Sequence, residues 1–198
     1  MNMILLSSSL SLIISLALLS SIHGQSRAGS EEISKWIRTK MNDPKVATEF
    51  QEHRAIIDKV CDPLFNPEVC WERQIKGLEM LLALSRKDSE LSKGGRETIQ
   101  SELAQLQSKL SRWKALPQAQ KEERLKIAEN LIDTVKKSGN AKKGLQQIET
   151  DPKQNQRTRG AARKAAEGVS KICINCLCVQ EKGCPCCDYD EIVSSLVE

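Results

Sequence analysis

The chain contains 198 residues, and its 30 basic and 26 acidic residues leave a formal net charge of +4. Such a small excess, with both signs mixed along the chain, does not indicate a nucleic-acid partner. Three Trp, two Phe and one Tyr are also too few to provide stacking platforms for single-stranded nucleic acid.

The first element in chain order is an apolar segment at residues 4–19, with the sequence ILLSSSLSLIISLALL. Its length fits the hydrophobic region of a signal peptide and falls short of the roughly 20 residues that span a bilayer. Small residues follow, so we expect cleavage before Gln25. Residues 1–24 are therefore predicted to be a signal peptide and the protein to be secreted and extracellular. A membrane anchor or a buried helix is the alternative for this segment, and no later segment predicts stable membrane insertion.

The pattern from Ser30 to Ala166 is helical and is interrupted by proline and glycine. It lacks the alternation of β-branched and aromatic residues that is typical of strands. The fold class is therefore predicted to be all-α, with a helical bundle of five to six helices in residues 25–170. A cysteine-rich tail, residues 171–198, is expected to form a C-terminal knuckle.

Capping residues and prolines set the expected boundaries of the first three helices. Ser30 is expected to begin the first helix, and Asp43 with Pro44 begins the second. Two prolines interrupt residues 61–70, after which Asn66 is expected to cap a third helix.

The later helices are bounded by glycine and proline in the same way. The fourth is expected after Gly94-Gly95 and ends at Pro117, and the fifth runs from about residue 118 to 137. A short sixth piece and a thin helix lead to the tail. The tail's last residues, 188–198, are expected to be disordered or to dock as a single strand or turn.

Apolar residues at helical spacing predict which face of each helix is buried. The expected core positions are Ile33, Trp36, Ile37, Met41, Val46, Ala47, Phe50, Ile57, Val60, Ile75, Leu78, Leu81, Leu82, Ile99, Leu103, Leu106, Leu110, Trp113, Leu125, Ala128, Leu131, Ile132, Val135, Leu145 and Ile148.

No arrangement of residues predicts catalysis, so we expect a protein that is not an enzyme, with no catalytic residues. A hydrolase needs a nucleophile with a base within reach. After export the chain retains one histidine, His53, between Glu52 and Arg54, where a solvated surface position is the ordinary explanation.

Eight cysteines, an even number, are expected to pair as disulfides in an oxidising compartment. A bridge between Cys61 and Cys70 would clip the link between two helices and stabilise the fold by about 2.5–3 kcal/mol. The other six lie in the tail and allow fifteen pairings, which stay open. They are Cys173, Cys176, Cys178, Cys184, Cys186 and Cys187.

Zinc is the alternative for the tail, and no other cofactor is expected. Thiolates of Cys173, Cys176, Cys184 and Cys187 have spacings typical of a structural zinc site. Export favours disulfides, so zinc is expected only in a reducing compartment.

A basic run before the tail suggests contacts with an anionic partner. Its residues are Lys153, Arg157, Arg159, Arg163 and Lys164. A solvated helix face is the favoured interpretation, because no aromatic residue lies between these charges and Glu167 interrupts them.

The leading hypothesis for function is a secreted, non-enzymatic interaction protein with a protein partner. One form of it is a pathogen or parasite effector that acts on host proteins and is delivered into host cells. At the level of class, the chain resembles the small secreted cysteine-containing effectors of plant pathogens. The alternatives are a helical carrier of a small apolar ligand, or an inhibitor of a secreted hydrolase that uses the loop at residues 181–183. The sequence leaves the oligomeric state open.

Overall fold

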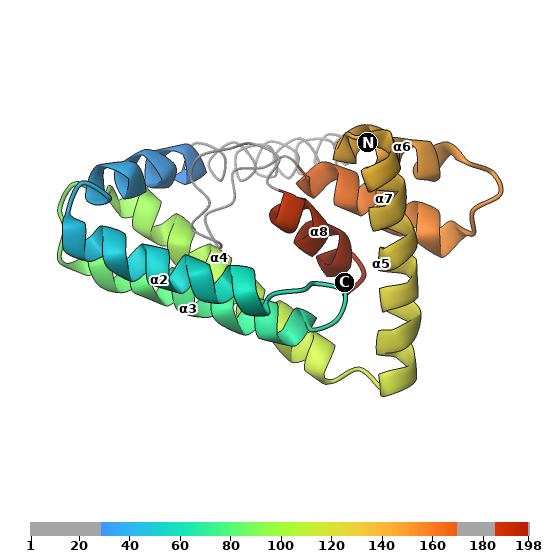
Figure 1. Ribbon diagram of the computed structural model, residues 1–198, viewed down its shortest axis with the longest axis horizontal. Helices are drawn as coiled ribbons and strands as arrows, with labels where there is room; N and C mark the ends of the chain where they lie inside the picture. Colours follow the sequence, from blue (N-terminus) through green and yellow to red (C-terminus); the bar gives the residue numbers. More distant parts are fainter. Residues whose placement is uncertain (1–28, 170–184, 198) are drawn as a thin grey trace, which may run out of the picture.

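The computed structural model describes residues 29–169 and 185–197, which form helices joined by short turns and loops, with no strand in either range (Figure 1). The predicted all-α class is therefore confirmed. The predicted signal peptide at residues 1–24 and the cysteines from Cys173 to Cys184 lie outside the described residues.

The described ranges contain eight helices. Residues 29–40 form the first, and the others are α2 (Pro44–Val60), α3 (Pro67–Arg86), α4 (Lys93–Lys114), α5 (Gln118–Ser138), α6 (Ala141–Thr150), α7 (Gln156–Gly168) and α8 (Pro185–Ser194). The sequence pattern predicted five to six. The count is higher because α6 and α7 are complete helices and because the tail contributes α8.

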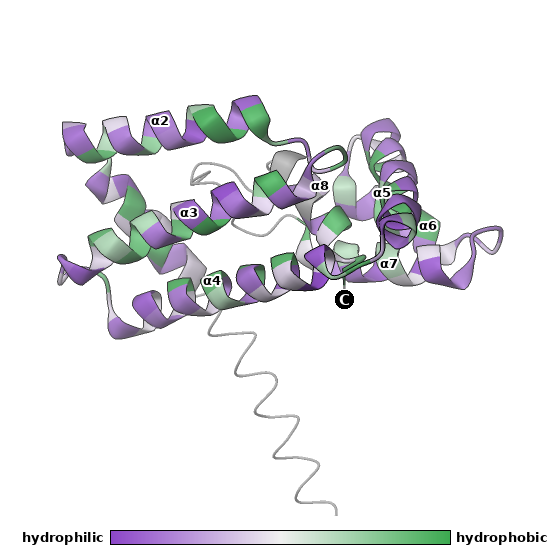
Figure 2. Ribbon diagram, turned by 90° about the horizontal axis from the view of Figure 1, so that it is seen from below, coloured by the Kyte–Doolittle hydropathy of each residue, from purple (hydrophilic) through white to green (hydrophobic). Residues whose placement is uncertain are grey.

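The helices form two groups. In the N-terminal group, residues 29–114, α3 packs along α4 and α2 covers α3; Figure 2 shows these three helices side by side, each with hydrophobic and hydrophilic residues. In the C-terminal group, residues 118–169 and 185–197, α6 packs on both α5 and α7, and α8 lies against α5 and α7. The short link at residues 115–117 joins the two groups.

Two expected helix boundaries are found where the sequence placed them. Asp43 caps α2 by accepting a hydrogen bond from the Lys45 N–H at 2.9 Å, and Pro44 follows at the first helical position. Gly139 ends α5 in a left-handed conformation, with φ of 64°, which glycine adopts without steric cost.

The start of α3 is where the sequence predicted it, but Asn66 does not play the expected capping role. Asn66 occupies the N-cap position of α3, but its side chain does not cap the helix. The side-chain oxygen accepts from the Asp62 N–H and the side-chain nitrogen donates to the Val60 carbonyl, both at 2.8 Å. Asn66 therefore fixes the preceding loop and not the helix.

The core follows the expected stripes, with one large addition. Trp71 is fully buried, although the sequence pattern did not assign it to the core. Its indole meets that of Trp113 edge to face, with ring centroids 5.7 Å apart and an interplanar angle of 86°. Such pairs contribute about 0.5–1.5 kcal/mol beyond their buried area, so this contact ties α3 firmly to α4.

Ionic contacts around the tryptophan pair connect α3, α4 and α5. Lys121, in the first turn of α5, binds Glu68 at 2.9 Å and lies 5.8 Å from the centroid of a Trp113 ring. Lys114 at the end of α4 binds Glu72 at 2.6 Å. The start of α5 is therefore held against α3 as well as joined to α4.

The end of the tail is helical and buried, so the expectation of disorder, a strand or a turn was wrong for α8. Ile192, Val193, Leu196 and Val197 are all buried. Ile192 and Leu196 are four residues apart, as are Val193 and Val197, and this spacing places all four on one side of a helix. Arg124 of α5 donates to the Leu196 carbonyl, which anchors the residues beyond α8.

Within the described ranges, the structure contains no helix both long and apolar enough to cross a bilayer.

The buried position of Trp113 leads to a stability prediction. Trp113→Ala removes the edge-to-face pair and leaves a cavity, so it is expected to lower the free energy of unfolding by about 3–5 kcal/mol. Urea denaturation of the chain from residue 25 onward measures the change. The matched control is Phe65→Ala, which removes an exposed aromatic ring and is expected to cost less than about 0.5 kcal/mol. Equal losses for the two variants would contradict the packing described here.

Candidate functional site

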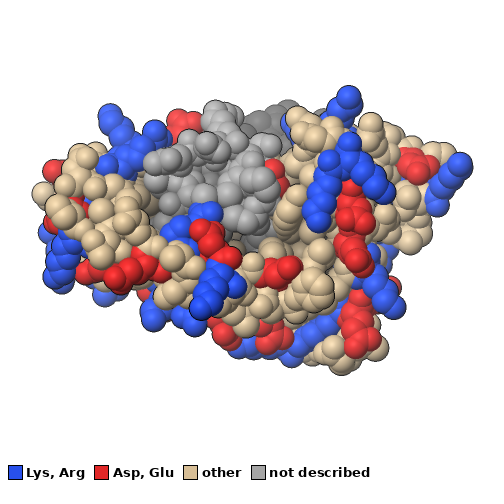
Figure 3. Space-filling view, in the orientation of Figure 1, with Lys and Arg blue, Asp and Glu red and all other residues tan. Residues whose placement is uncertain are grey.

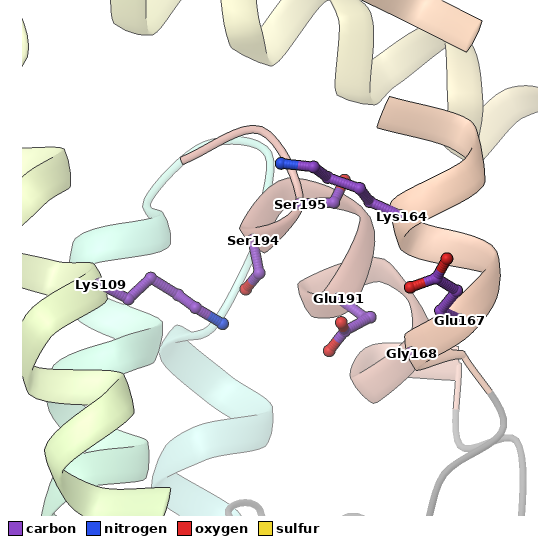
Figure 4. Close-up of a pocket in the computed structure, with 7 residues that line it drawn as sticks. All are labelled: Lys109, Lys164, Glu167, Gly168, Glu191, Ser194 and Ser195. Atoms are coloured by element: carbon purple, nitrogen blue, oxygen red, sulfur yellow. The ribbon is translucent and has the colours of Figure 1, made fainter. Parts of the chain in front are cut away.

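A small polar pocket of about 180 Å³ lies where the two helix groups face each other (Figure 4). Lys109 enters it from α4, whereas the other lining residues come from α7 and from the end of α8. The lining consists of Lys109, Lys164, Glu167, Gly168, Glu191, Ser194 and Ser195.

The pocket contains no activated nucleophile. Ser194 is 2% exposed and its hydroxyl has no hydrogen-bond partner, so Lys109 does not bind it. Ser195 donates to the Ile192 carbonyl at 2.8 Å. Two ammonium groups and two carboxylates balance one another in charge, and the space is polar and smaller than the several hundred cubic ångströms of ordinary ligand pockets. It gives no support to an apolar carrier.

Gly168 allows the close approach of α7 and α8 at this pocket. The Glu191 side chain lies so near Gly168 that a Cβ at position 168 would overlap its carboxylate. The glycine therefore lets the Glu191 side chain of α8 lie directly against the α7 backbone.

His53 is buried, which corrects the expectation of a solvated surface position. It is only 5% exposed, and its Nε2 atom has no hydrogen-bond partner. It follows Phe50 by three residues and precedes Ile57 by four, and this helical spacing was the sequence signal for burial. The charged neighbours Glu52 and Arg54 obscured it.

The environment of His53 suits a neutral imidazole. Burial lowers the pKa of His53 below its usual 6.5, and the nearby positive charges of Lys76 and Arg73 lower it further, against a hydrogen bond to the Arg73 backbone. The ring acts as a contact between α2 and α3. These contacts account for the residue without a catalytic role.

The loop between α2 and α3 is ordered by its own hydrogen bonds. Asp62 Oδ1 accepts from the N–H groups of Leu64 at 3.0 Å and Phe65 at 3.3 Å. The Asn66 side chain, from the end of the loop, binds the backbone of Val60 and Asp62 at its start. Phe65 projects from it and is 85% exposed, although it is a large apolar side chain.

Cys61 and Cys70 lie at the two ends of this region. Cys61 is half-buried and Cys70 is buried, with its thiol 3.7 Å from Asn66 Oδ1. Both residues are in the thiol form in the structure, so their disulfide stays a prediction for the exported protein. The side chains of Cys186 and Cys187, like residues 173–184, lie outside the described part of the chain.

The residues of the predicted basic run have different surroundings, and their contact with an anionic partner stays a prediction. Arg157 binds Glu123 of α5, and the Nε atom of Arg159 is buried without a hydrogen-bond partner. Lys153, Arg163 and Lys164 are exposed. A denser basic group, the lysine pairs on either side of Gly139, was not predicted, because each pair falls within a different predicted helix.

No grouping of three or more His, Cys, Asp or Glu side chains that could hold a metal ion is found among the described residues. The proposed zinc ligands Cys173, Cys176 and Cys184 lie outside those residues, and so does the Cys187 side chain.

Comparisons with protein-family models, with curated proteins and with solved structures give no match to this chain.

The buried imidazole predicts a pH dependence of stability. Because the folded-state pKa of His53 lies below the unfolded value of 6.5, protons bind the unfolded chain more tightly. Stability is therefore complete above about pH 6.5 and falls as the pH drops below it, by at most about 1.4 kcal/mol per pH unit from this group. Urea titrations of the chain from residue 25 onward, at about pH 7.5 and about pH 5, measure it.

His53→Gln provides the comparison for this experiment. It removes the titrating group and keeps a polar side chain, so its stability is expected to change less over the same range of pH. Parallel losses in the wild type and in His53→Gln would show that other groups cause the dependence.

The cysteine prediction is tested by intact mass. The exported chain, purified without reductant, is expected to resist alkylation and to take up eight alkyl groups after reduction, as four disulfides require. Alkylation of Cys61 or Cys70 before reduction would contradict the bridge between them. Zinc bound by reduced protein would identify the alternative chemistry of the tail.

Proposed function

We propose that the protein is secreted and acts by binding another protein, without catalysis, as an effector of a pathogen or parasite acts on a host protein. The observation that carries the proposal is the exposure of Phe65 on an ordered loop. The expected location is extracellular, and delivery into host cells is a further form of the same proposal.

Phe65 has the properties of an interface anchor. Aromatic side chains are enriched in protein interfaces, and a few such anchors usually account for much of the binding free energy. Burying a Phe side chain stabilises a complex by about 1.5–3 kcal/mol. In the free protein this gain is not used, because the ring points into solvent.

The order of the loop reduces the cost of binding. Fixing one residue's backbone costs about 1–2 kcal/mol in conformational entropy. The Asp62 and Asn66 side chains already hold the loop in the free protein. A disulfide between Cys61 and Cys70, which export would permit, would hold it further. A partner would thus meet a Phe side chain on a prearranged backbone.

The experiment places a photoreactive benzophenone analogue of phenylalanine at position 65. We expect covalent adducts with one partner protein when the labelled chain is mixed with proteins from the compartment it reaches after export. Excess unlabelled wild type is expected to suppress the adduct, and the same excess of Phe65→Ala to suppress it much less. The matched control carries the analogue at Ala55, an exposed position on α2.

Ile56→Ala is a second competitor, because Ile56 is the other large exposed apolar side chain in the described ranges, at 41%. If it suppresses the adduct as well as wild type does, the anchor is Phe65 alone. Equal suppression by wild type and Phe65→Ala, or equal labelling from positions 55 and 65, would overturn the proposal.

A further inference from the structure

Four lysines surround the corner at which α5 turns into α6. Lys136 and Lys137 lie in the last turn of α5, and Lys142 and Lys143 in the first turn of α6. All four are exposed. Figure 3 shows Lys and Arg side chains gathered over this end of α5 and over α6, at the upper right of the view. We call these four residues the lysine corner.

The lysine corner lies within the most basic stretch of the chain. Residues 134–166 contain nine basic and two acidic residues, a net charge of +7. The whole chain carries +4, so the remaining residues together carry −3. The modest total charge therefore hides a strong separation of charge along the sequence.

Among the described residues, no carboxylate forms an ion pair with three of the four lysines of the corner. Lys40, Lys114 and Lys121 each bind a carboxylate within 3 Å. By contrast, no described carboxylate lies within ion-pair distance of Lys137, Lys142 or Lys143, and Lys136 lies over the Tyr189 ring at 5.6 Å. Like charges grouped at one corner repel one another, and an acidic ligand would relieve this repulsion.

A shallow, open hollow on α6 adjoins the corner. It is lined by Lys143, Gln146, Gln147, Glu149 and Thr150. The two exposed glutamine amides can each donate and accept hydrogen bonds, as main-chain peptide groups require. The corner thus combines cations for carboxylates with amides that suit a peptide backbone.

The neighbouring groups, and not the lysines themselves, indicate the class of partner. All four cations are lysines, whose ammonium groups bind carboxylates and phosphates alike as point charges. In the described ranges, the large exposed apolar side chains are Ile56 and Phe65, in the other helix group, so none is available here to insert into a membrane.

We propose that the lysine corner and the adjoining hollow on α6 bind an acidic peptide segment of a partner protein. The carboxylates of the segment pair with Lys137, Lys142 and Lys143, and its main chain meets Gln146 and Gln147. The inference rests on the proposed function, because it assumes that the partner is a protein. It does not depend on the role proposed for Phe65.

The test uses a fluorescein-labelled decapeptide of alternating glutamate and serine, with fluorescence anisotropy as the readout. The chain from residue 25 onward is expected to bind it, and to bind more weakly as NaCl rises from about 0.05 M to about 0.2 M. The same peptide with glutamine in place of glutamate is expected not to bind. Failure of the glutamate peptide to bind would overturn the proposal.

Charge reversal locates the site. The double variant Lys142→Glu/Lys143→Glu is expected to bind the peptide about tenfold or more weakly, because two attractions become repulsions. The matched control is Lys35→Glu/Lys45→Glu, which makes the same change in net charge at two exposed lysines of the N-terminal group. It is expected to bind within about twofold of wild type. Equal losses in both variants would show a general charge effect and overturn the site.

Two controls address folding and the class of partner. Lys142→Arg/Lys143→Arg keeps the charge and is expected to retain binding, and circular dichroism checks that each variant is folded. Tighter binding to phosphatidylserine vesicles or to single-stranded DNA than to the peptide would overturn the assignment to an acidic peptide. Phe65→Ala is expected to bind the peptide as wild type does, so this proposal and that for Phe65 can fail separately.

Discussion

The edge-to-face contact between Trp71 and Trp113 is the interaction on which the arrangement of the two helix groups depends. Pro117 lies directly between α4 and α5, so no continuous helix carries the direction of one into the other. The direction of α5 is set instead by side chains. Lys121 lies over Trp113 and binds Glu68 at the start of α3. The buried ring pair and its cation therefore position α5, and through α5 they position α6, α7 and α8.

The tail completes the second group instead of trailing from it. Helices α5 and α7 each present a buried side to α8, and Arg124 holds the chain beyond α8 by its Leu196 carbonyl. Burial lowers the pKa of Arg124, and the charge of Arg157 lowers it further, against the opposing effect of Glu123. Burying the Arg124 guanidinium costs desolvation free energy. Its hydrogen bond to the Leu196 carbonyl offsets this cost.

The sequence could predict those parts of the fold that depend on local spacing. The stripes at Ile33, Leu78 and Leu131, the cap at Asp43 and the stop at Gly139 all follow from periodicity and turn chemistry. Contacts between residues far apart in the chain could not be predicted from the sequence. Charged neighbours hid the burial of His53, the burial of Trp71 follows from its packing on α4, and the helix of the tail is stabilised by α5 and α7. The candidate surfaces could not be predicted for the same reason. Phe65 is exposed because no distant part of the described chain packs against it.

The two proposed surfaces belong to different helix groups and have different chemistry, one apolar and one basic. Each alone provides modest affinity, because a single aromatic anchor and a few exposed ion pairs contribute only a few kcal/mol in total. The Trp71–Trp113 contact, which positions α5 through Lys121, allows the two surfaces to act together. Two contacts held on a rigid frame reach a partner with little further loss of entropy, so their free energies combine where a flexible link would dilute them. A helical protein with two such surfaces can in this way recognise a partner specifically, and loss of the contact between Trp71 and Trp113 would reduce recognition without altering either surface.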